Sequence, residues 1–234
     1  MTIRRIGEFT DAPVRRGRPP LDRERLVGAA LEVLDEVGLD GLTMRCLADR
    51  LGVKAASLYW HVGNKEELLG LVADEIGAGV REPDLSLAWR ERLEALAWEN
   101  RRVLLSHRDA VRILAGATPT GSNRLRLAEI TLRALLEAGL AHQEAAHASL
   151  LLTDYATGFV SEEVMLANAA RKRGMRLEEA LAEVRGQFES LPVEEYPSMV
   201  MLAGQLTNAD ADERFRFGLE VLLDGLEKRL IEGG

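Results

Sequence analysis

Residues 42–69 read LTMRCLADRLGVKAASLYWHVGNKEELL, and this stretch has the dimensions of a helix-turn-helix. Thr43 is suited to cap a two-turn helix, and Gly52 is suited to end it, because glycine tolerates the left-handed conformation that follows many helices. A second helix is predicted over residues 54–61, and its first turn is small and polar. Small side chains let a helix N-terminus approach base edges in the major groove. The spacing is therefore compatible with DNA binding, although an αα-corner without that function has the same dimensions.

Helical periodicity continues on both sides of this motif, with apolar residues at intervals of three and four and no convincing strand. A first helix is predicted from its N-cap Asp22 to Gly38, and another over residues 65–79, where Asn64 and Glu67 have capping-box spacing. Further helices are predicted over residues 89–105, 122–138, 142–166 and 211–231. Between the last two, residues 167–209 contain a charged helical stretch and a loop around Pro192 and Pro197. The fold class predicted is all-α.

The composition is that of a soluble globular protein, with 47% hydrophobic and 29% charged residues among 234. The single cysteine excludes a disulfide within the chain, and no apolar run approaches the roughly 20 residues of a membrane span. The N-terminus has basic residues but lacks the apolar segment of a secretory signal. We therefore expect a cytoplasmic protein without a membrane partner.

The net charge of −8 is unevenly distributed. Residues 1–70 hold 11 basic and 11 acidic side chains, so all the excess negative charge lies in residues 71–234. Within the first part, residues 1–20 and 43–65 each carry about three surplus positive charges. A polyanion is expected to meet these two stretches and to be repelled elsewhere.

The stretch 42–69, preceded by ALEVLDEVGLDG, closely resembles the DNA-binding domain of the TetR (tetracycline-repressor) family of bacterial transcription regulators. This resemblance covers residues 21–75, and its most specific segment is LYWHVGNKEELL. It continues more weakly through LLSHRDAVRILAG, TPT, TGFVSEE and FRFGLEVLLDGLEKRL, which are similar to the C-terminal domain of the tetracycline repressors within that family. The family implies a homodimeric repressor of double-stranded, palindromic operator DNA, released by a small-molecule effector.

The resemblance also implies a domain order. We expect a flexible basic arm over residues 1–20, a three-helix helix-turn-helix DNA-binding domain over 21–64, a linking helix over 65–80, and a helical ligand-binding and dimerisation domain over 81–234.

DNA-contacting positions of the family fall on two parts of this chain. In the motif they are Thr43, Arg45, Lys54, Ala55, Ala56, Ser57, Tyr59, His61 and Lys65. Because the two alanines cannot hydrogen-bond bases, readout is expected to depend on the basic side chains and Ser57, and the operator should differ from that of the tetracycline system. For Tyr59 the alternative is partial burial, and for His61 a structural role at a helix end.

The arm supplies the second group, Arg15, Arg16 and Arg18, in the sequence RRGRPP. Its two prolines exclude a helix, and an extended Arg-Gly-Arg-Pro resembles an AT-hook that enters the narrow minor groove of A·T-rich DNA. A solvated tail is the alternative.

The family's Mg²⁺–tetracycline site is largely replaced. Leu114 stands at the position of a metal-binding histidine and Arg81 at that of another, whereas Glu162 persists. We therefore expect no metal, no cofactor and no tight tetracycline binding, and a largely apolar effector. The candidate lining residues are Leu96, Asn100, Leu114, Thr118, Ile130, Tyr155 and Glu162, for each of which core packing is an alternative.

Wide apolar faces on residues 142–166 and 211–231 suggest that these helices pair in a dimer. The candidate interface residues are Leu152, Phe159, Phe215, Leu219, Leu222 and Leu226.

An enzyme is not indicated. His142 and His147 in HQEAAH resemble a metalloprotease helix, but five residues separate them by roughly 140° around the axis, so they cannot share one metal. No nucleophile accompanies His107, and there is no phosphate-binding loop. The remaining alternative is an all-α ligand- or partner-binding protein that does not bind DNA. That alternative would not explain the surplus positive charge of the motif.

Overall fold

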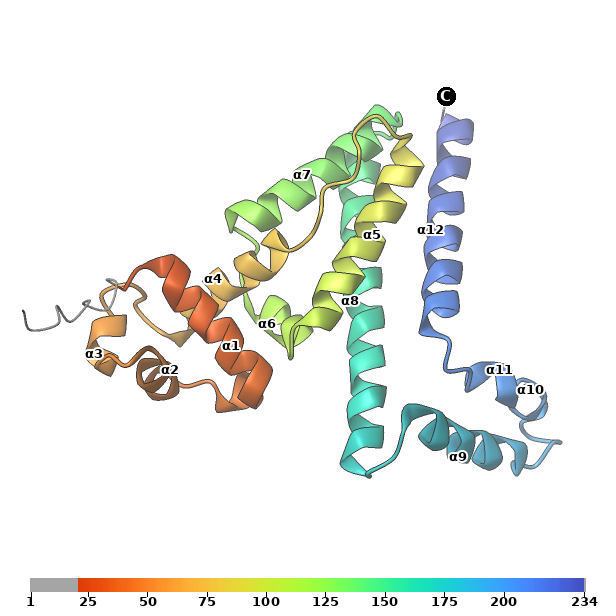
Figure 1. The fold of residues 1–234 in the computed structure, drawn as a ribbon. Coiled ribbons are helices and arrows are strands. Elements are labelled where there is room, and N and C mark those ends of the chain that lie inside the picture. Colours follow the sequence, from red (N-terminus) through yellow and green to blue (C-terminus); the bar gives the residue numbers. More distant parts are fainter. Residues whose placement is uncertain (1–20, 234) are drawn as a thin grey trace, which may run out of the picture.

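The computed structural model describes residues 21–233, and this part of the chain forms twelve helices and no strand (Figure 1). The prediction of an all-α fold is confirmed. The predicted arm with Arg15, Arg16 and Arg18 lies outside the described residues.

Three helices form the head, which comprises residues 21–64. They are α1 (Arg23–Gly41), α2 (Met44–Leu51) and α3 (Ala55–Leu58). Asp22 caps α1 by accepting a hydrogen bond from the N–H of Arg25 at 2.8 Å, and Thr43 caps α2 by accepting one from the N–H of Cys46 at 3.1 Å. Both caps lie where the sequence predicts them.

Two predicted boundaries in the head need correction. The first helix does not stop at Gly38 but breaks there, at φ 77°, and resumes as far as Gly41. The helix predicted over residues 54–61 is a single turn, α3, followed by tight turns. Leu58 and Val62 at its inner side are 0% and 1% exposed, so anchoring in the core, rather than helix length, holds this segment in place.

Helix α4 (Lys65–Ala78) connects the head to the body, which comprises residues 81–233. Asn64 accepts a hydrogen bond from the N–H of Glu67 at 2.7 Å, and the Glu67 carboxylate accepts one from the N–H of Gly63 at 2.7 Å, one residue earlier than a capping box requires. Leu68, Val72 and Ile76 along α4 belong to one apolar cluster that runs from the head into the body.

The body is a bundle around a long helix, and Figure 1 shows α12 running beside α8. Its main helices are α5 (Trp89–Ser106), α6 (Ala110–Gly116), α7 (Ser122–Glu137), α8 (His142–Lys172) and α12 (Ala211–Gly233). Helix α8 extends six residues beyond the predicted residue 166, because the alanine-rich sequence after it favours helix until Gly174 takes φ 70°.

Residues 177–206 form a helical extension that projects from the end of α8 (Figure 1). It contains α9 (Leu177–Glu189), α10 (Pro197–Met201) and α11 (Ala203–Leu206). Pro197 begins α10 instead of lying in a loop, since proline fits the first turn of a helix. No residue of α9 or α10 is buried.

One arginine and four aromatic side chains, Trp98, Tyr155, Phe159 and Phe215, pack together in the body. The ring centroid of Phe215 lies 4.8 Å from that of Trp98 and 5.2 Å from that of Phe159. The guanidinium of Arg101, a residue only 6% exposed, lies 5.2 Å from the Phe215 centroid and donates to both oxygens of Glu163 at 3.1 Å. This cluster joins α5, α8 and α12.

The predicted interface residues belong largely to this core. Leu152, Phe215, Leu219 and Leu226 are between 0% and 8% exposed, and Phe159 and Leu222 pack against the same cluster. Their apolar periodicity reflects packing of α8 and α12 against the rest of the protomer. The pairing of two copies through these side chains stays a prediction.

Candidate DNA-binding face and effector pocket

The outer surface of the head carries several of the predicted DNA-contacting side chains. Arg45 and Lys54 are exposed, and neither forms an ion pair within the described chain. The side chain of Tyr59 is 52% exposed, so about half of its surface is open to solvent. These three side chains are free to reach a ligand outside the head.

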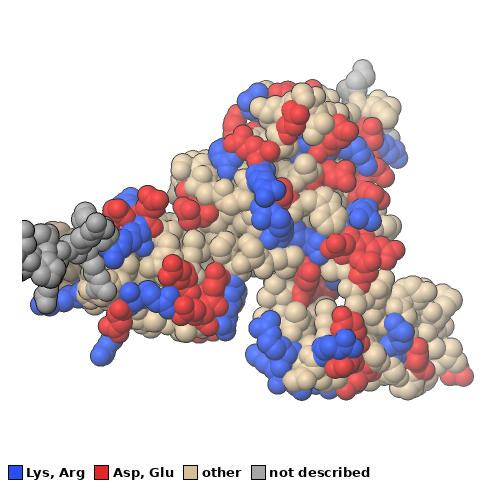
Figure 2. All heavy atoms as spheres, in the orientation of Figure 1, with Lys and Arg blue, Asp and Glu red and all other residues tan. Residues whose placement is uncertain are grey.

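Other cations of the motif are engaged within the protein. Arg50 pairs with Glu32 at 3.3 Å and also with Glu36, both on α1. The Nζ of Lys65 donates to the carbonyl of Leu39 at 3.3 Å. The positive surplus that the sequence indicates for residues 43–65 is therefore concentrated at fewer positions, and Figure 2 shows acidic side chains beside basic ones on the head.

The remaining motif positions differ in access. Ala56 is exposed, whereas Ala55, Ser57 and His61 are half-buried. Trp60 is 89% exposed and was not among the predicted residues. The sequence could have indicated that Trp60 is exposed. The inward-facing residues Leu58 and Val62 lie two positions before and two positions after it, which places Trp60 on the opposite side of the segment.

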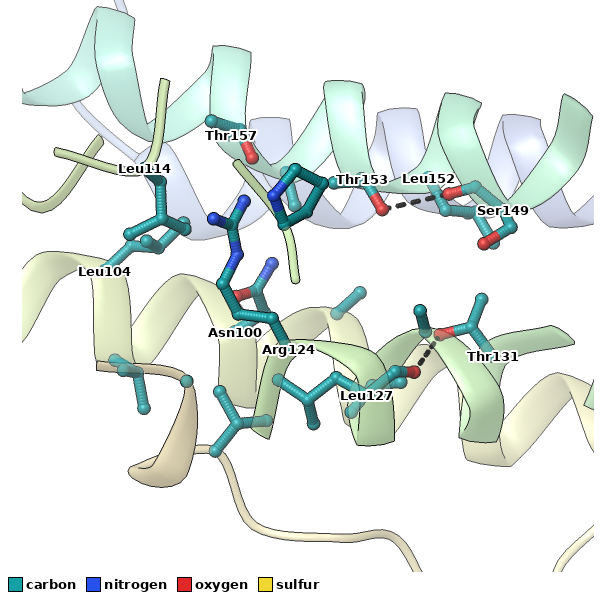
Figure 3. Close-up of a pocket in the computed structure, with 18 of the residues that line it drawn as sticks. Asn100, Leu104, Leu114, Arg124, Leu127, Thr131, Ser149, Leu152, Thr153 and Thr157 are labelled. Carbon is teal, nitrogen blue, oxygen red and sulfur yellow. Dashed lines mark hydrogen bonds between the residues drawn. The ribbon is translucent and has the colours of Figure 1, made fainter. Parts of the chain in front are cut away.

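A cavity of about 390 Å³ lies in the body between α4, α5, α7 and α8 (Figure 3). Of the predicted lining residues, Leu96, Asn100 and Leu114 lie on its wall. Leu152, predicted at an interface, is a wall residue too. Most of the wall is aliphatic, so the cavity suits an apolar molecule of drug-like size.

Four predicted lining residues lie elsewhere. Thr118 is exposed in the turn between α6 and α7, and Ile130 packs against the apolar cluster that the head shares. The hydroxyl of Tyr155 donates to the carbonyl of Phe215 at 2.7 Å, and Glu162 pairs with Arg214 at 3.6 Å. None of the four is on the wall of this cavity, and their part in ligand binding stays a prediction.

The sequence did not identify Arg124, which projects into the cavity from the first turn of α7 (Figure 3). Its guanidinium donates to the carbonyl of Ala117 at 3.0 Å. Burial lowers the pKa of Arg124, and the charge of Asp74 offsets this only in part. A basic residue in the first turn of a helix opposes the helix dipole, and that signal could have singled it out.

Asp74 of α4 joins this helix to the start of α7. Its Oδ1 accepts hydrogen bonds from the N–H groups of Asn123 at 2.9 Å and Arg124 at 3.0 Å. A Cβ at Gly121 would collide with the same carboxylate, so the close approach requires glycine there. Asp74 thus acts as an N-cap supplied by another helix.

A second contact joins head and body at the turn before α6. Asp109 has φ 58°, and its Oδ2 accepts a hydrogen bond from the N–H of Leu39 at 2.8 Å. Asp40 pairs with Arg112 at 2.8 Å, and this guanidinium lowers the pKa of the Asp40 carboxyl. The head is therefore held by α4 and by this polar contact.

No group of three or more metal-ligating side chains occurs among residues 21–233. That the protein binds no metal stays a prediction. Over the same residues, no helix combines the length and apolar character that crossing a bilayer requires.

Two protein-family models match the chain. The model "Bacterial regulatory proteins, tetR family" matches residues 26–72, and "Tetracyclin repressor-like, C-terminal domain" matches residues 82–230. Tetracycline repressor protein class A from transposon 1721 of Escherichia coli is 36% identical over 212 residues, which are 89% of this chain and 92% of that protein.

Two further relatives come from Streptomyces. The HTH-type transcriptional repressor DrrR1 of Streptomyces coeruleorubidus is 32% identical over 229 residues, 97% of this chain and 84% of that protein. The crystal structure of the Streptomyces coelicolor TetR family protein ActR in complex with actinorhodin is similar with a TM-score of 0.81 and 37% identity, covering 91% of this chain and 99% of that one.

Proposed function

Since the chain belongs to the TetR family of bacterial regulatory proteins, we propose that it binds a palindromic operator as a homodimer and is released by a small molecule other than Mg²⁺–tetracycline. Members of this family are DNA-binding, ligand-responsive transcriptional regulators, so the chain is a regulator and not an enzyme. ActR, a similar protein, is solved with actinorhodin, which supports a small-molecule effector.

The observation that carries the proposal is the double role of α4. At one end Leu68 and Val72 are 1% and 0% exposed and belong to the apolar cluster that includes the core of the head. At the other end Ile76 and Gly77, together with Val80 beyond it, form part of the cavity wall. A ligand that fills the cavity must contact the helix that carries the head.

Ligand binding and DNA binding would then favour different positions of α4. If the effector fits only the position that tilts the heads away from the operator, each ligand weakens the affinity for the other by the same factor. The polar contact of Asp109 with Leu39 gives the head a second hinge point against the body.

The homodimer is proposed to use the outer sides of α8 and α12. Large apolar side chains are exposed there: Leu151 at 48% and Met165 at 61% on α8, and Phe217 at 70% and Val221 at 53% on α12. A monomer rarely exposes such a patch, and a two-fold pairing would cover it. Helices α8 and α12 would then pair as the sequence predicts, through the exposed side chains of their outer sides.

This interface can be tested without disturbing the core. Phe217→Glu and Val221→Glu should give folded monomers with weak operator affinity, measured by sedimentation velocity and circular dichroism. Leu226→Glu, at a residue only 8% exposed, should unfold the body instead. Variants of the first two residues that remain dimeric would place the interface elsewhere.

The wall of the cavity supports the proposal that Mg²⁺–tetracycline is not the effector. Leu114 packs there beside Leu104 (Figure 3), and neither offers an atom that can ligate a metal. We expect tetracycline, with or without Mg²⁺, to leave operator binding unchanged in a fluorescence-anisotropy titration. Release at micromolar tetracycline would refute this part of the proposal.

The decisive experiment is selection of bound sites from random duplex DNA, followed by sequencing. A palindrome with half-sites about one helical turn, roughly 34 Å, apart is expected from a dimeric helix-turn-helix protein. No enrichment by the folded protein would contradict operator binding.

The selected site then allows the head to be mapped. Arg45→Ala and Lys54→Ala should lower affinity and reduce the slope of log K against log salt by about 1 for each lost phosphate contact. Arg171→Ala, at an exposed position near the far end of α8, is the matched control and should leave the slope unchanged.

A further inference from the structure

We propose that the effector is a hydrophobic anion, with a carboxylate or an ionised phenol that pairs with Arg124 inside the cavity. This inference rests on the proposed function, in which the cavity is the effector site. It adds the chemical class of the ligand.

The first observation is the contrast between Arg124 and the buried arginines of the body. Arg92 donates to Glu137 at 2.6 Å, and Arg101 donates to Glu163 at 3.1 Å. The guanidinium of Arg124 forms no ion pair within residues 21–233, and the hydrogen bond that it does donate ends on a carbonyl. A partly buried cation without an anion is costly unless a ligand supplies one.

The nearest protein carboxylate does not fill that role. Asp74 is close enough to influence Arg124, but its two oxygens are occupied by N–H groups at the start of α7 and by the side chains of Ser122 and Asn123. The described residues on the cavity wall include no aspartate or glutamate. A ligand anion would therefore meet a guanidinium without an ion-pair partner and no negative side chain on the wall.

Neutral polar groups gather at the same end of the cavity. Figure 3 shows Asn100 of α5 and Thr157 of α8 on either side of the Arg124 guanidinium. Neither side chain has a hydrogen-bond partner within the described chain. Both can donate to an oxyanion, and together with the guanidinium fork they would hold it from three helices.

The rest of the cavity accepts the apolar part of the molecule. Figure 3 shows Leu127 and Leu152 farther along the cavity. The hydroxyl groups there are already hydrogen-bonded within their helices: Thr131 donates to the carbonyl of Leu127 at 3.0 Å, and Thr153 donates to the carbonyl of Ser149 at 2.9 Å. A ligand with an anionic end and an apolar, ring-sized body matches both ends.

Recognition at Arg124 would also be well placed to act on the head. The backbone N–H of this residue is held by Asp74 of α4 at 3.0 Å. An anion that draws the guanidinium towards it therefore pulls on a residue bonded directly to the linking helix.

The test compares two fluorescent probes that differ in charge, anthracene-9-carboxylate and 9-anthracenemethanol. Their dissociation constants are measured with the full-length protein, Arg124→Met, Arg124→Lys and Arg126→Met. The last is the matched control, since Arg126 lies on α7 but pairs with Glu82 at 2.5 Å outside the cavity. Thr131→Trp, which fills the cavity, locates the probes by abolishing the binding of both.

Wild-type protein and the Arg126 variant should bind the carboxylate more tightly than the alcohol. Arg124→Met should weaken carboxylate binding by about 10-fold to 100-fold, the range for a charge-assisted hydrogen bond, and change alcohol binding by less than about 2-fold. Arg124→Lys should retain part of the preference because it keeps the charge. Circular dichroism melts verify that each variant is folded.

An unchanged ratio of the two affinities in folded Arg124→Met, or no preference in the wild type, would overturn the inference. If the alcohol still binds in that case and operator selection succeeds, the proposed function stands without it. If neither probe binds the wild type, the cavity is not an effector site for apolar molecules, and the proposed effector site and this inference fall together.

Discussion

Removing the Asp74 carboxylate should weaken the joint between α4 and α7. In Asp74→Ala the N–H groups of Asn123 and Arg124 lose an acceptor at 2.9 and 3.0 Å, and the Asn123 side-chain amide loses one at 3.2 Å. The N-cap residue of α7, Gly121, has no side chain that could replace it.

The magnitude follows from these bonds. Loss of an N-cap side chain costs about 0.5–2 kcal/mol, and each buried donor left unsatisfied adds about 1–3 kcal/mol. Asp74 is half-buried, so water can reach part of the exposed helix end and reduce the second contribution. We expect a loss of about 2 kcal/mol in the free energy of unfolding. Asp74→Asn should lose less, because an amide oxygen can still accept from both backbone groups.

The assay is urea unfolding followed by circular dichroism at one fixed protomer concentration, since dimerisation would contribute to stability. Glu75→Ala is the matched control: the residue is next to Asp74 on α4, is exposed, and should change stability by less than about 0.5 kcal/mol. If Asp74→Ala unfolds at the same urea concentration as the control, the carboxylate does not hold the two helices together.

Three further predictions concern the head and the core. Gly38→Ala should lower stability by about 1–3 kcal/mol, because φ is 77° there and the new Cβ would lie 2.9 Å from Oδ2 of Asp109; an unchanged melting curve would contradict this. Glu163→Ala should cost about 1–3 kcal/mol in urea unfolding, because buried Arg101 loses two charge-assisted hydrogen bonds and keeps only its ion pair with Asp212 at 2.7 Å; an unchanged unfolding midpoint would show that the Glu163 pair is dispensable. The pKa of Asp40 is lowered from its ordinary value of 3.8, so its ion pair stabilises the fold above that pH and is lost as pH falls through the lowered value. The difference in free energy of unfolding between wild type and Asp40→Asn should therefore be constant from about pH 5 to 8 and shrink below about pH 4. A difference that does not depend on pH would show that the Asp40 carboxyl does not act through its charge.

Local signals in the sequence predicted the start of several helices accurately. Asp22, Thr43 and Asn64 cap α1, α2 and α4 as expected, because an N-cap depends on one side chain and the backbone two or three residues later. Helix ends were predicted less well. The α3 segment shortens to one turn, and α8 continues to Lys172, because tertiary packing and the position of the next glycine decide where a helix stops.

Periodicity predicted which helices are amphipathic but not what covers their apolar faces. Leu152, Phe215 and Leu226 form the core of one protomer, whereas the exposed apolar residues of the same helices, such as Phe217, were not selected. A buried stripe in a protomer and a buried stripe between protomers have the same period, so the two cannot be told apart along the chain.

The sequence by itself determined the family, the all-α class and the head with its motif, because these depend on contiguous residues whose spacing sets caps, turns and exposed positions. Only the tertiary structure decided which side chains line the cavity, that Arg50 is neutralised by α1, and that Arg124 faces the cavity without an anion. Each of these depends on residues from different helices meeting in space. Their distances follow from how the helices pack, which no local spacing encodes.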